Sequence, residues 1–133
     1  MAGYSGKPLA EKLGIKPGMR VVALNAPRGY RALLGKLPVG ARVGESATPR
    51  AFVHWFVRDR RTLEAQFAAL ARDLAPAGML WVSWPKRGAK IATDLTETVV
   101  REVGLGTGLV DVKVCAVDET WSGLKFVRRL KDR

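Results

Sequence analysis

The sequence predicts an α/β domain with a three-layer, Rossmann-like fold, a mostly parallel sheet and a C-terminal antiparallel hairpin. Strand-like apolar runs alternate with helix-like amphipathic segments through most of the chain, a pattern typical of parallel sheets. The last two strand-like segments instead follow one another directly. A length of 133 residues suits one domain spanning residues 1–133 and is too short for two. Flexible ends are expected at about residues 1–6 and 131–133.

A helix and a strand are expected to open the fold. Residues 7–15 favour a short helix that ends before Pro17 and Gly18, which cannot continue it. Residues 19–25, "MRVVALN", are an apolar run with β-branched residues, typical of a strand covered on both faces.

The next three segments complete a second strand–helix unit. Residues 28–37 place Tyr30 and three leucines at helical spacing before a stop at residues 38–40. Residues 41–46 favour a short edge strand, and "RAFVHWFV" at 50–57 favours a central one.

The clearest helix is expected over residues 60–74. Its apolar positions form one stripe, Asp59 can cap the first turn, and "APAG" at 75–78 should end it. The next strand is "MLWVSW", residues 79–84.

The last third is expected to hold one helix and the hairpin. In "TDLTETVVREVGL", residues 93–105, Thr93 or Asp94 is the expected N-cap, with Glu97 in capping-box spacing. Two alternating strands follow, with the turn of the hairpin at Ser122 and Gly123.

Trp81 and Trp84 occupy one strand three residues apart, so their side chains are expected on opposite faces of the sheet. This arrangement excludes a shared stacking surface. Trp81 is predicted to be core, whereas Trp84 stands at the carboxyl end of its strand. His54 and Cys115, the only histidine and cysteine, lie inside apolar strands and are interpreted as structural.

A ligand site is predicted at the rim formed by the carboxyl ends of the parallel strands, where open α/β sheets bind ligands. An anionic or aromatic small molecule would find charge partners in Arg28 and Lys86 and apolar walls in Trp84 or Trp121. The alternative is that Trp84 caps the core and the basic residues are solvated. The candidate rim residues are Asn25, Arg28, Gly29, Tyr30, Arg58, Asp59, Trp84, Lys86, Asp118, Glu119, Trp121 and Ser122.

Composition and motifs exclude several classes of function. The longest apolar runs are far shorter than the roughly 20 residues of a membrane span, no secretory signal is present, and cytoplasmic residence is the expectation. No metal-ligand cluster, P-loop or G-x-S-x-G nucleophile motif occurs, and no residue is assigned a catalytic role. "GLGTG" at 104–108 follows a helix and precedes a strand, which is the wrong context for a dinucleotide loop.

The charge is strongly positive and uneven along the chain. The formal net charge is +11, of which residues 1–44 contribute +7. Such a field attracts nucleic acid without regard to its sequence, although lysine and arginine also serve as ordinary solubilising residues.

Two resemblances accompany these patterns. "WVSWPK" and "VDETWSGLKFV" resemble a small uncharacterised bacterial family, a domain of unknown function, which implies a family identity and no activity. "LGIKPGMRVVALNAPRGY" and "APAGMLWVSWP" resemble the first glycine-rich turn and a late strand of class I methyltransferases. That resemblance implies S-adenosylmethionine as a cofactor, with Glu45 as the ribose-binding acid. The chain departs from it by having only Gly29 in the turn, one strand–helix unit fewer, and no catalytic motif of those enzymes.

Three hypotheses follow. The leading one is a non-catalytic binding domain, without a cofactor, for an anionic small molecule or an acidic partner. The second is a reduced S-adenosylmethionine-dependent methyltransferase-like enzyme. The third is nonspecific association with nucleic acid through the basic N-terminal third.

Overall fold

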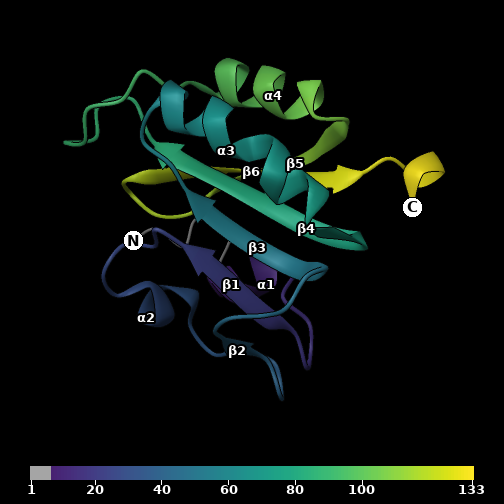
Figure 1. The fold of residues 1–133 in the computed structure, drawn as a ribbon. Helices are drawn as coiled ribbons and strands as arrows, with labels where there is room; N and C mark the ends of the chain where they lie inside the picture. The colour runs from purple at the N-terminus through teal and green to yellow at the C-terminus, as the bar shows by residue number, and fades with distance from the viewer. Residues whose placement is uncertain (1–6) are drawn as a thin grey trace.

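The computed structural model describes residues 7–133, which form one six-stranded sheet between two layers of helices (Figure 1). The strand order is β2-β1-β3-β4-β6-β5. Strands β1 to β4 run parallel, whereas β6 is antiparallel to both β4 and β5. The mostly parallel α/β sheet with a C-terminal hairpin is therefore confirmed.

The elements follow the predicted order, with shifted ends. They are α1 (Leu9–Lys12), β1 (Arg20–Leu24), α2 (Tyr30–Leu34), β2 (Arg42–Val43), β3 (Arg50–Phe56), α3 (Arg60–Arg72), β4 (Leu74–Pro85), α4 (Glu97–Gly106), β5 (Leu109–Ala116), β6 (Trp121–Arg128) and the 3-10 helix η1 (Leu130–Asp132). Both N-terminal helices are shorter than the sequence suggests. Residues 1–6, expected to be flexible, lie outside the described residues, and the 131–133 end belongs mostly to η1.

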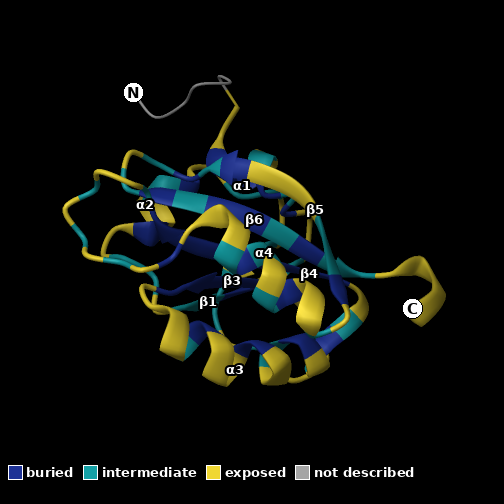
Figure 2. Cartoon of the chain, turned by 90° about the horizontal axis from the view of Figure 1, so that it is seen from above, coloured by how far each residue is buried: buried dark blue, intermediate teal, exposed yellow. Residues whose placement is uncertain are grey.

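Each face of the sheet has its own core. One core packs α3 and α4 against residues such as Trp55, Trp84 and Phe126, and the other packs α1 and α2 against Phe52 and Trp81. Figure 2 shows α1 and α3 on opposite sides of the strands, with the buried residues between them. Trp81 and Trp84 thus face opposite layers, as the alternation of side chains predicts.

Three local expectations are wrong. "APAG" does not end α3 as a turn, because β4 already begins at Leu74, where it pairs with Arg50. Helix α4 begins later than predicted, and its N-cap is Thr96, whose hydroxyl accepts a hydrogen bond from the Val99 amide. Ser122 and Gly123 lie within β6, paired with Trp84 and Ser83 respectively.

Two aspartates account for the wrong expectations about the cap of α4 and the hairpin turn. The Asp94 carboxylate accepts from the Arg60 amide at 2.9 Å and so caps α3, a neighbouring helix. The hairpin turn precedes β6, where Asp118 accepts from the amides of Thr120 and Trp121, both at 2.8 Å. Asp118 therefore closes the turn that the Ser-Gly pair was expected to form.

The last strand ties the layers together. The Arg128 guanidinium donates to the carbonyl oxygens of Ala71 at 2.9 Å and Leu74 at 2.6 Å, where α3 ends. Terminal helix carbonyls have no intrahelical partner, and a cation there also complements the helix dipole. On α4, Gly104 lies so close to β6 that a Cβ atom there would be 2.2 Å from the Phe126 ring.

Within residues 7–133, none of the helices has the length and hydropathy needed to span a bilayer. The same residues contain no group of histidine, cysteine, aspartate and glutamate side chains that could hold a metal ion.

Candidate functional site

The direction in which successive strands are added to the sheet reverses after β2, between the parallel strands β1 and β3. From β1 the chain passes to β2 on one side, and it returns to form β3 on the other, so the carboxyl ends of β1 and β3 flank the switch point of the sheet. Figure 1 shows the arrowheads of β1, β3 and β4 at the same edge. A crevice at such a point is the usual ligand site of open α/β sheets.

Two cavities lie at this edge. The first, about 390 Å³, is bounded by the ends of β1 and β3 and the start of α3; it is lined by Asn25, Ala26, Phe56, Val57, Arg58, Asp59 and Thr62. The second, about 440 Å³, is bounded by β1, α2 and β2; it is lined by Ala23, Ala26, Gly29, Tyr30, Arg31, Ala32 and Val43. Ala26 lines both, so the two cavities adjoin at the turn after β1. We call them together the crevice.

The turn after β1 has an unusual backbone. Asn25 has a φ of 56°, the only left-handed value of a residue other than glycine among residues 7–133. Asparagine tolerates this conformation better than most residues, and such positions gather at functional sites. Gly29 also has a positive φ, 83°, and a Cβ atom built there would meet nothing within 4 Å. The turn therefore leaves its backbone open to the crevice.

A buried hydrogen-bonded chain lies behind the second cavity. The Tyr30 hydroxyl is 2.7 Å from Nδ1 of His54, and Nε2 of His54 is 2.7 Å from the Ser83 hydroxyl. His54 and Ser83 are fully buried, and Tyr30 is 5% exposed. Burial lowers the pKa of His54 to about 3, so the ring is neutral, and burial raises the pKa of Tyr30. The chain joins α2 to β3 and β4, which agrees with the structural interpretation of His54.

The wall of the crevice beside β3 is held by its neighbours. Asp59 accepts from the Thr62 amide at 2.8 Å, and that hydrogen bond is the main cause of its lowered pKa. The Thr93 hydroxyl donates to the Arg58 carbonyl at 2.6 Å. Asp59 is thus an ionised helix cap at the mouth of the crevice, and the loop before α4 fixes the backbone beside it.

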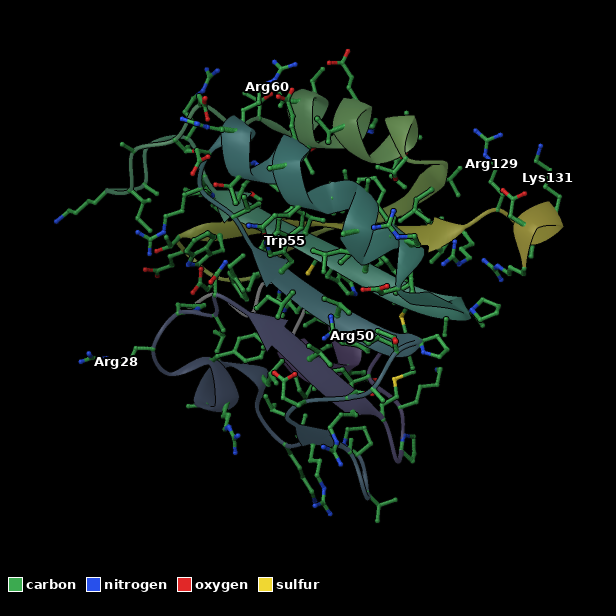
Figure 3. All side chains as sticks on the ribbon, in the orientation of Figure 1. Arg28, Arg50, Trp55, Arg60, Arg129 and Lys131 are labelled. Atoms are coloured by element: carbon green, nitrogen blue, oxygen red, sulfur yellow. The ribbon has the colours of Figure 1, made fainter. Side chains whose placement is uncertain are left out.

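The predicted rim residues share one edge of the sheet, but only some of them line the crevice. Asn25, Gly29, Tyr30, Arg58 and Asp59 do. The Arg28 side chain extends away from the domain (Figure 3). The ligand-binding roles of all these residues stay predictions.

The tryptophans expected as walls of the rim are core residues. Trp84 is 5% exposed and packs in the core beneath α3 and α4. Trp121 is 3% exposed, and its ring meets that of Phe56 edge to face at 5.0 Å. Neither ring lines the crevice. For Trp84, the alternative of a core cap therefore describes the structure better.

The remaining predicted residues lie at the same edge but outside the crevice. The Lys86 amide donates to the Thr120 carbonyl at 2.8 Å, which ties the end of β4 to the hairpin turn. Glu119 is exposed in that turn. Glu45 is exposed two residues after β2, and its carbonyl accepts from Arg20 at 2.8 Å.

Sequence reasoning missed Ala23, Arg31 and Val43, which line the second cavity. Small or aliphatic residues inside strands carry no chemical signal, and Arg31 was counted only as charge. They come together only because β2 pairs with β1 and α2 packs beside them, which no local sequence pattern reveals.

No family model and no curated protein matches the sequence. Solved structures do match its fold. Fibrillarin from Aeropyrum pernix, solved with natively bound S-adenosyl-L-methionine, has a TM-score of 0.56 at 13% identity, over 86% of this chain and 69% of that chain. Magnesium protoporphyrin IX methyltransferase from Synechocystis, solved with bound SAH, has a TM-score of 0.53 at 12% identity, over 91% and 78%.

A third similar structure is described as a pericyclic reaction enzyme; it has a TM-score of 0.50 at 10% identity, over 96% of this chain and 40% of that chain. One fold therefore accompanies different reactions, as is common. The resemblance inferred from the sequence is confirmed at the level of architecture: the chain has the fold of class I S-adenosylmethionine-dependent methyltransferases.

Proposed function

We propose that the protein is a reduced methyltransferase-like protein that binds S-adenosylmethionine in the crevice. The observation that carries the proposal is the position of the crevice, at the switch point of a sheet whose fold matches proteins solved with this cofactor or with SAH. The proposal commits to binding, because the same fold accompanies a different reaction in one structural neighbour.

The residues present fit an adenosine-type group in size and polarity. Each cavity lies in the usual range for small-molecule pockets, about 300–1,000 Å³. Ala23, Ala26 and Val43 offer a small, apolar surface suited to a flat base, and the open backbone at Gly29 allows close approach.

The polar residues of the crevice suit one end of the cofactor better than the other. When bound, S-adenosylmethionine supplies a methyl group on a positively charged sulfonium, and the ionised carboxylate of Asp59 lies at the mouth of the crevice to balance such a charge. Glu45 is not among the residues that line the second cavity, and its role as the ribose-binding acid stays a prediction.

Calorimetric titration with S-adenosylmethionine and S-adenosylhomocysteine tests the proposal. Ala23→Leu would fill the second cavity and should weaken binding at least tenfold. Ala69→Leu, the same change on the exposed side of α3, should leave binding unchanged. Absence of binding heat at millimolar ligand, or equal affinities of wild type and Ala23→Leu, would refute the proposed site.

A second candidate function, binding of an anionic small molecule without catalysis, is favoured by Arg31. Its guanidinium side chain lines the second cavity, which contains no carboxylate among its lining residues. Thermal unfolding with ADP separates the two functions. A shift in Tm with ADP alone, lost in Arg31→Gln and kept in Arg61→Gln on the opposite helical layer, would favour the anion; a shift with S-adenosylmethionine alone would exclude it.

A further inference from the structure

Four lysines gather on the face of the hairpin that packs against α1. Lys113 of β5 and Lys125 of β6 are directly paired across the two strands. They lie on the α1 side, because Nζ of Lys113 donates to the Lys12 carbonyl and Lys125 pairs with Trp81 of the core beneath α1. Lys12 ends α1, and Lys16 follows in the next loop. We call Lys12, Lys16, Lys113 and Lys125 the lysine cluster. It combines residues that are about 100 positions apart in the sequence.

Contacts hold the lysine cluster together. Nζ of Lys113 donates to the carbonyl of Lys12 at 3.1 Å, and Nζ of Lys12 donates to the carbonyl of Ala116 at 3.2 Å. A Cβ atom added to Gly14 would lie 3.9 Å from Nζ of Lys125. The Lys125 ammonium group is therefore beside the loop that carries Gly14 and Lys16. Burial first, and then the charges of Lys113 and Lys16, lower the pKa of Lys125. The ammonium groups of Lys113 and Lys16 are therefore close enough to repel that of Lys125.

Within residues 7–133 none of the four lysines forms an ion pair, and the exposed Glu11 adjoins Lys12 in sequence and lines a cavity together with Lys16. The ion pairs in this part of the chain join Arg60 to Glu64, and Arg101 to Glu97 and Asp111, all on elements other than α1 or β6. Asp111 lies opposite Phe126, whose ring packs against α3 and α4. The Asp111 carboxylate therefore lies on the α3 and α4 face of the sheet, where it pairs with Arg101. Like charges placed directly across two strands are destabilising, and the fold retains that cost at Lys113 and Lys125.

We infer that the lysine cluster binds the phosphodiester backbone of a nucleic acid. Each strand of a duplex carries one negative charge per roughly 3.4 Å of axis, so more than one phosphate can lie against the lysine cluster. An extended acidic peptide places only every second side chain on one face, whereas every nucleotide of both strands of a duplex carries a charge. Lysine also binds phosphate as a point charge, and the net charge of +11 attracts polyanions at long range.

The inference is independent of the proposed function. No residue of the lysine cluster lines either cavity of the crevice. Exposed aromatic rings are absent from the cluster, so bases do not stack there and the contact is to phosphates, without preference for sequence. Its expected signature is a steep fall of affinity with salt, with a slope of about −0.9 for each phosphate contacted.

The experiment is fluorescence anisotropy of a labelled 20-base-pair duplex with the full chain, over a series of salt concentrations. The double variant Lys113→Gln/Lys125→Gln should reduce the magnitude of the salt slope by about 2 and weaken binding at low salt at least tenfold. The control, Arg61→Gln/Arg72→Gln, removes the same charge from exposed positions on α3 and should leave the slope within about 0.5 of wild type.

Three outcomes would overturn the inference. One is the absence of duplex binding by wild type at low salt. Another is an equal loss in both double variants, which would make the effect one of net charge. The third is competition by polyglutamate as strong as that by unlabelled duplex, which would indicate an acidic protein partner. Titration of the Lys113→Gln/Lys125→Gln variant with S-adenosylmethionine reports separately on the crevice.

Discussion

The Tyr30 hydroxyl and Nδ1 of His54 are 2.7 Å apart, and both groups are sealed from solvent. This contact attaches the short helix α2, which lines the second cavity, to the central strand β3. The rings also pack together: Tyr30 meets His54 edge to face at 5.3 Å, and His54 stacks on Phe56 at 4.3 Å. The wall of the crevice and the core of the sheet are therefore one packed unit.

Tyr30→Phe tests the hydrogen bond within that unit. The substitution keeps the ring and leaves Nδ1 of His54 without its partner in a dry environment, which should lower the free energy of unfolding by about 1–3 kcal/mol. Urea denaturation measures the change. Ser46→Ala removes a hydroxyl from an exposed backbone contact and should change stability by less than about 0.5 kcal/mol. Equal effects of the two substitutions would mean that the buried contact adds nothing.

Stability should fall in mild acid because of His54. The pKa of the buried ring is about 3, whereas in the unfolded chain it is about 6.5. Between these values the unfolded state binds a proton that the folded state does not, so the free energy of unfolding falls as the pH drops below 6.5, by up to about 1.4 kcal/mol per unit.

The measurement is urea denaturation between pH 7.5 and 4.5, with His54→Gln as the comparison. In His54→Gln the free energy of unfolding should no longer fall with pH over this range, whatever the stability of the variant at pH 7.5. Asp59 has a lowered pKa, so its contribution is present above about pH 4 and disappears below it, outside this window. An unchanged slope in His54→Gln would assign the acid sensitivity to other groups.

Two glycines of α4 should respond oppositely to alanine. At Gly104 a Cβ atom would be 2.2 Å from the Phe126 ring, so Gly104→Ala should destabilise the fold by about 1–3 kcal/mol or more. At Gly106 nothing lies within 4 Å, and Gly106→Ala should stabilise it by about 0.4–1 kcal/mol through the entropy of the unfolded chain. Thermal unfolding of both variants decides this, and effects of the same sign would contradict the close approach of α4 to β6.

Removing one charge from the cross-strand pair should stabilise the free protein. Lys113→Gln relieves the repulsion with Lys125 and should raise the free energy of unfolding by about 0.2–1 kcal/mol at low salt. The gain should shrink at high salt, since screening weakens the repulsion in wild type. Lys131→Gln on the exposed helix η1 is the control with no expected change. A destabilised Lys113→Gln would show that the contact with Lys12 outweighs the repulsion.

The central strands could be predicted from the sequence because apolar runs such as "RAFVHWFV" have few alternatives. The hairpin turn could not, because Ser122 and Gly123 are ordinary turn residues and only the Asp118 carboxylate, bonded to two amides, selects the turn before them. Helix α4 was predicted to begin too early for a similar reason. Its apparent cap, Asp94, bonds to α3, a tertiary contact that local spacing does not reveal.

The edge of the sheet that holds the candidate site could be predicted from the expected strand order. The residues that line the site could not. Parallel strands gather their ends whatever their sequence, which placed Asn25 and Arg58 at one edge. Whether a tryptophan at that edge is a wall or a core residue depends on what covers it, and Phe56 covers Trp121. The lysine cluster depends on α1 packing against a hairpin about 100 residues later in the chain, and nothing in either segment alone indicates it.

Strand β6 is last in the chain and yet interior to the sheet, between β4 and β5. While the protein is being synthesised, β4 therefore presents an unpaired edge, and the carbonyl groups at the end of α3 lack Arg128, until the residues after Trp121 emerge. Open strand edges are templates for pairing with other chains. A nascent chain that has emerged only as far as residue 120 therefore exposes this edge to pairing with other chains, and a chain that stops there would keep the edge open.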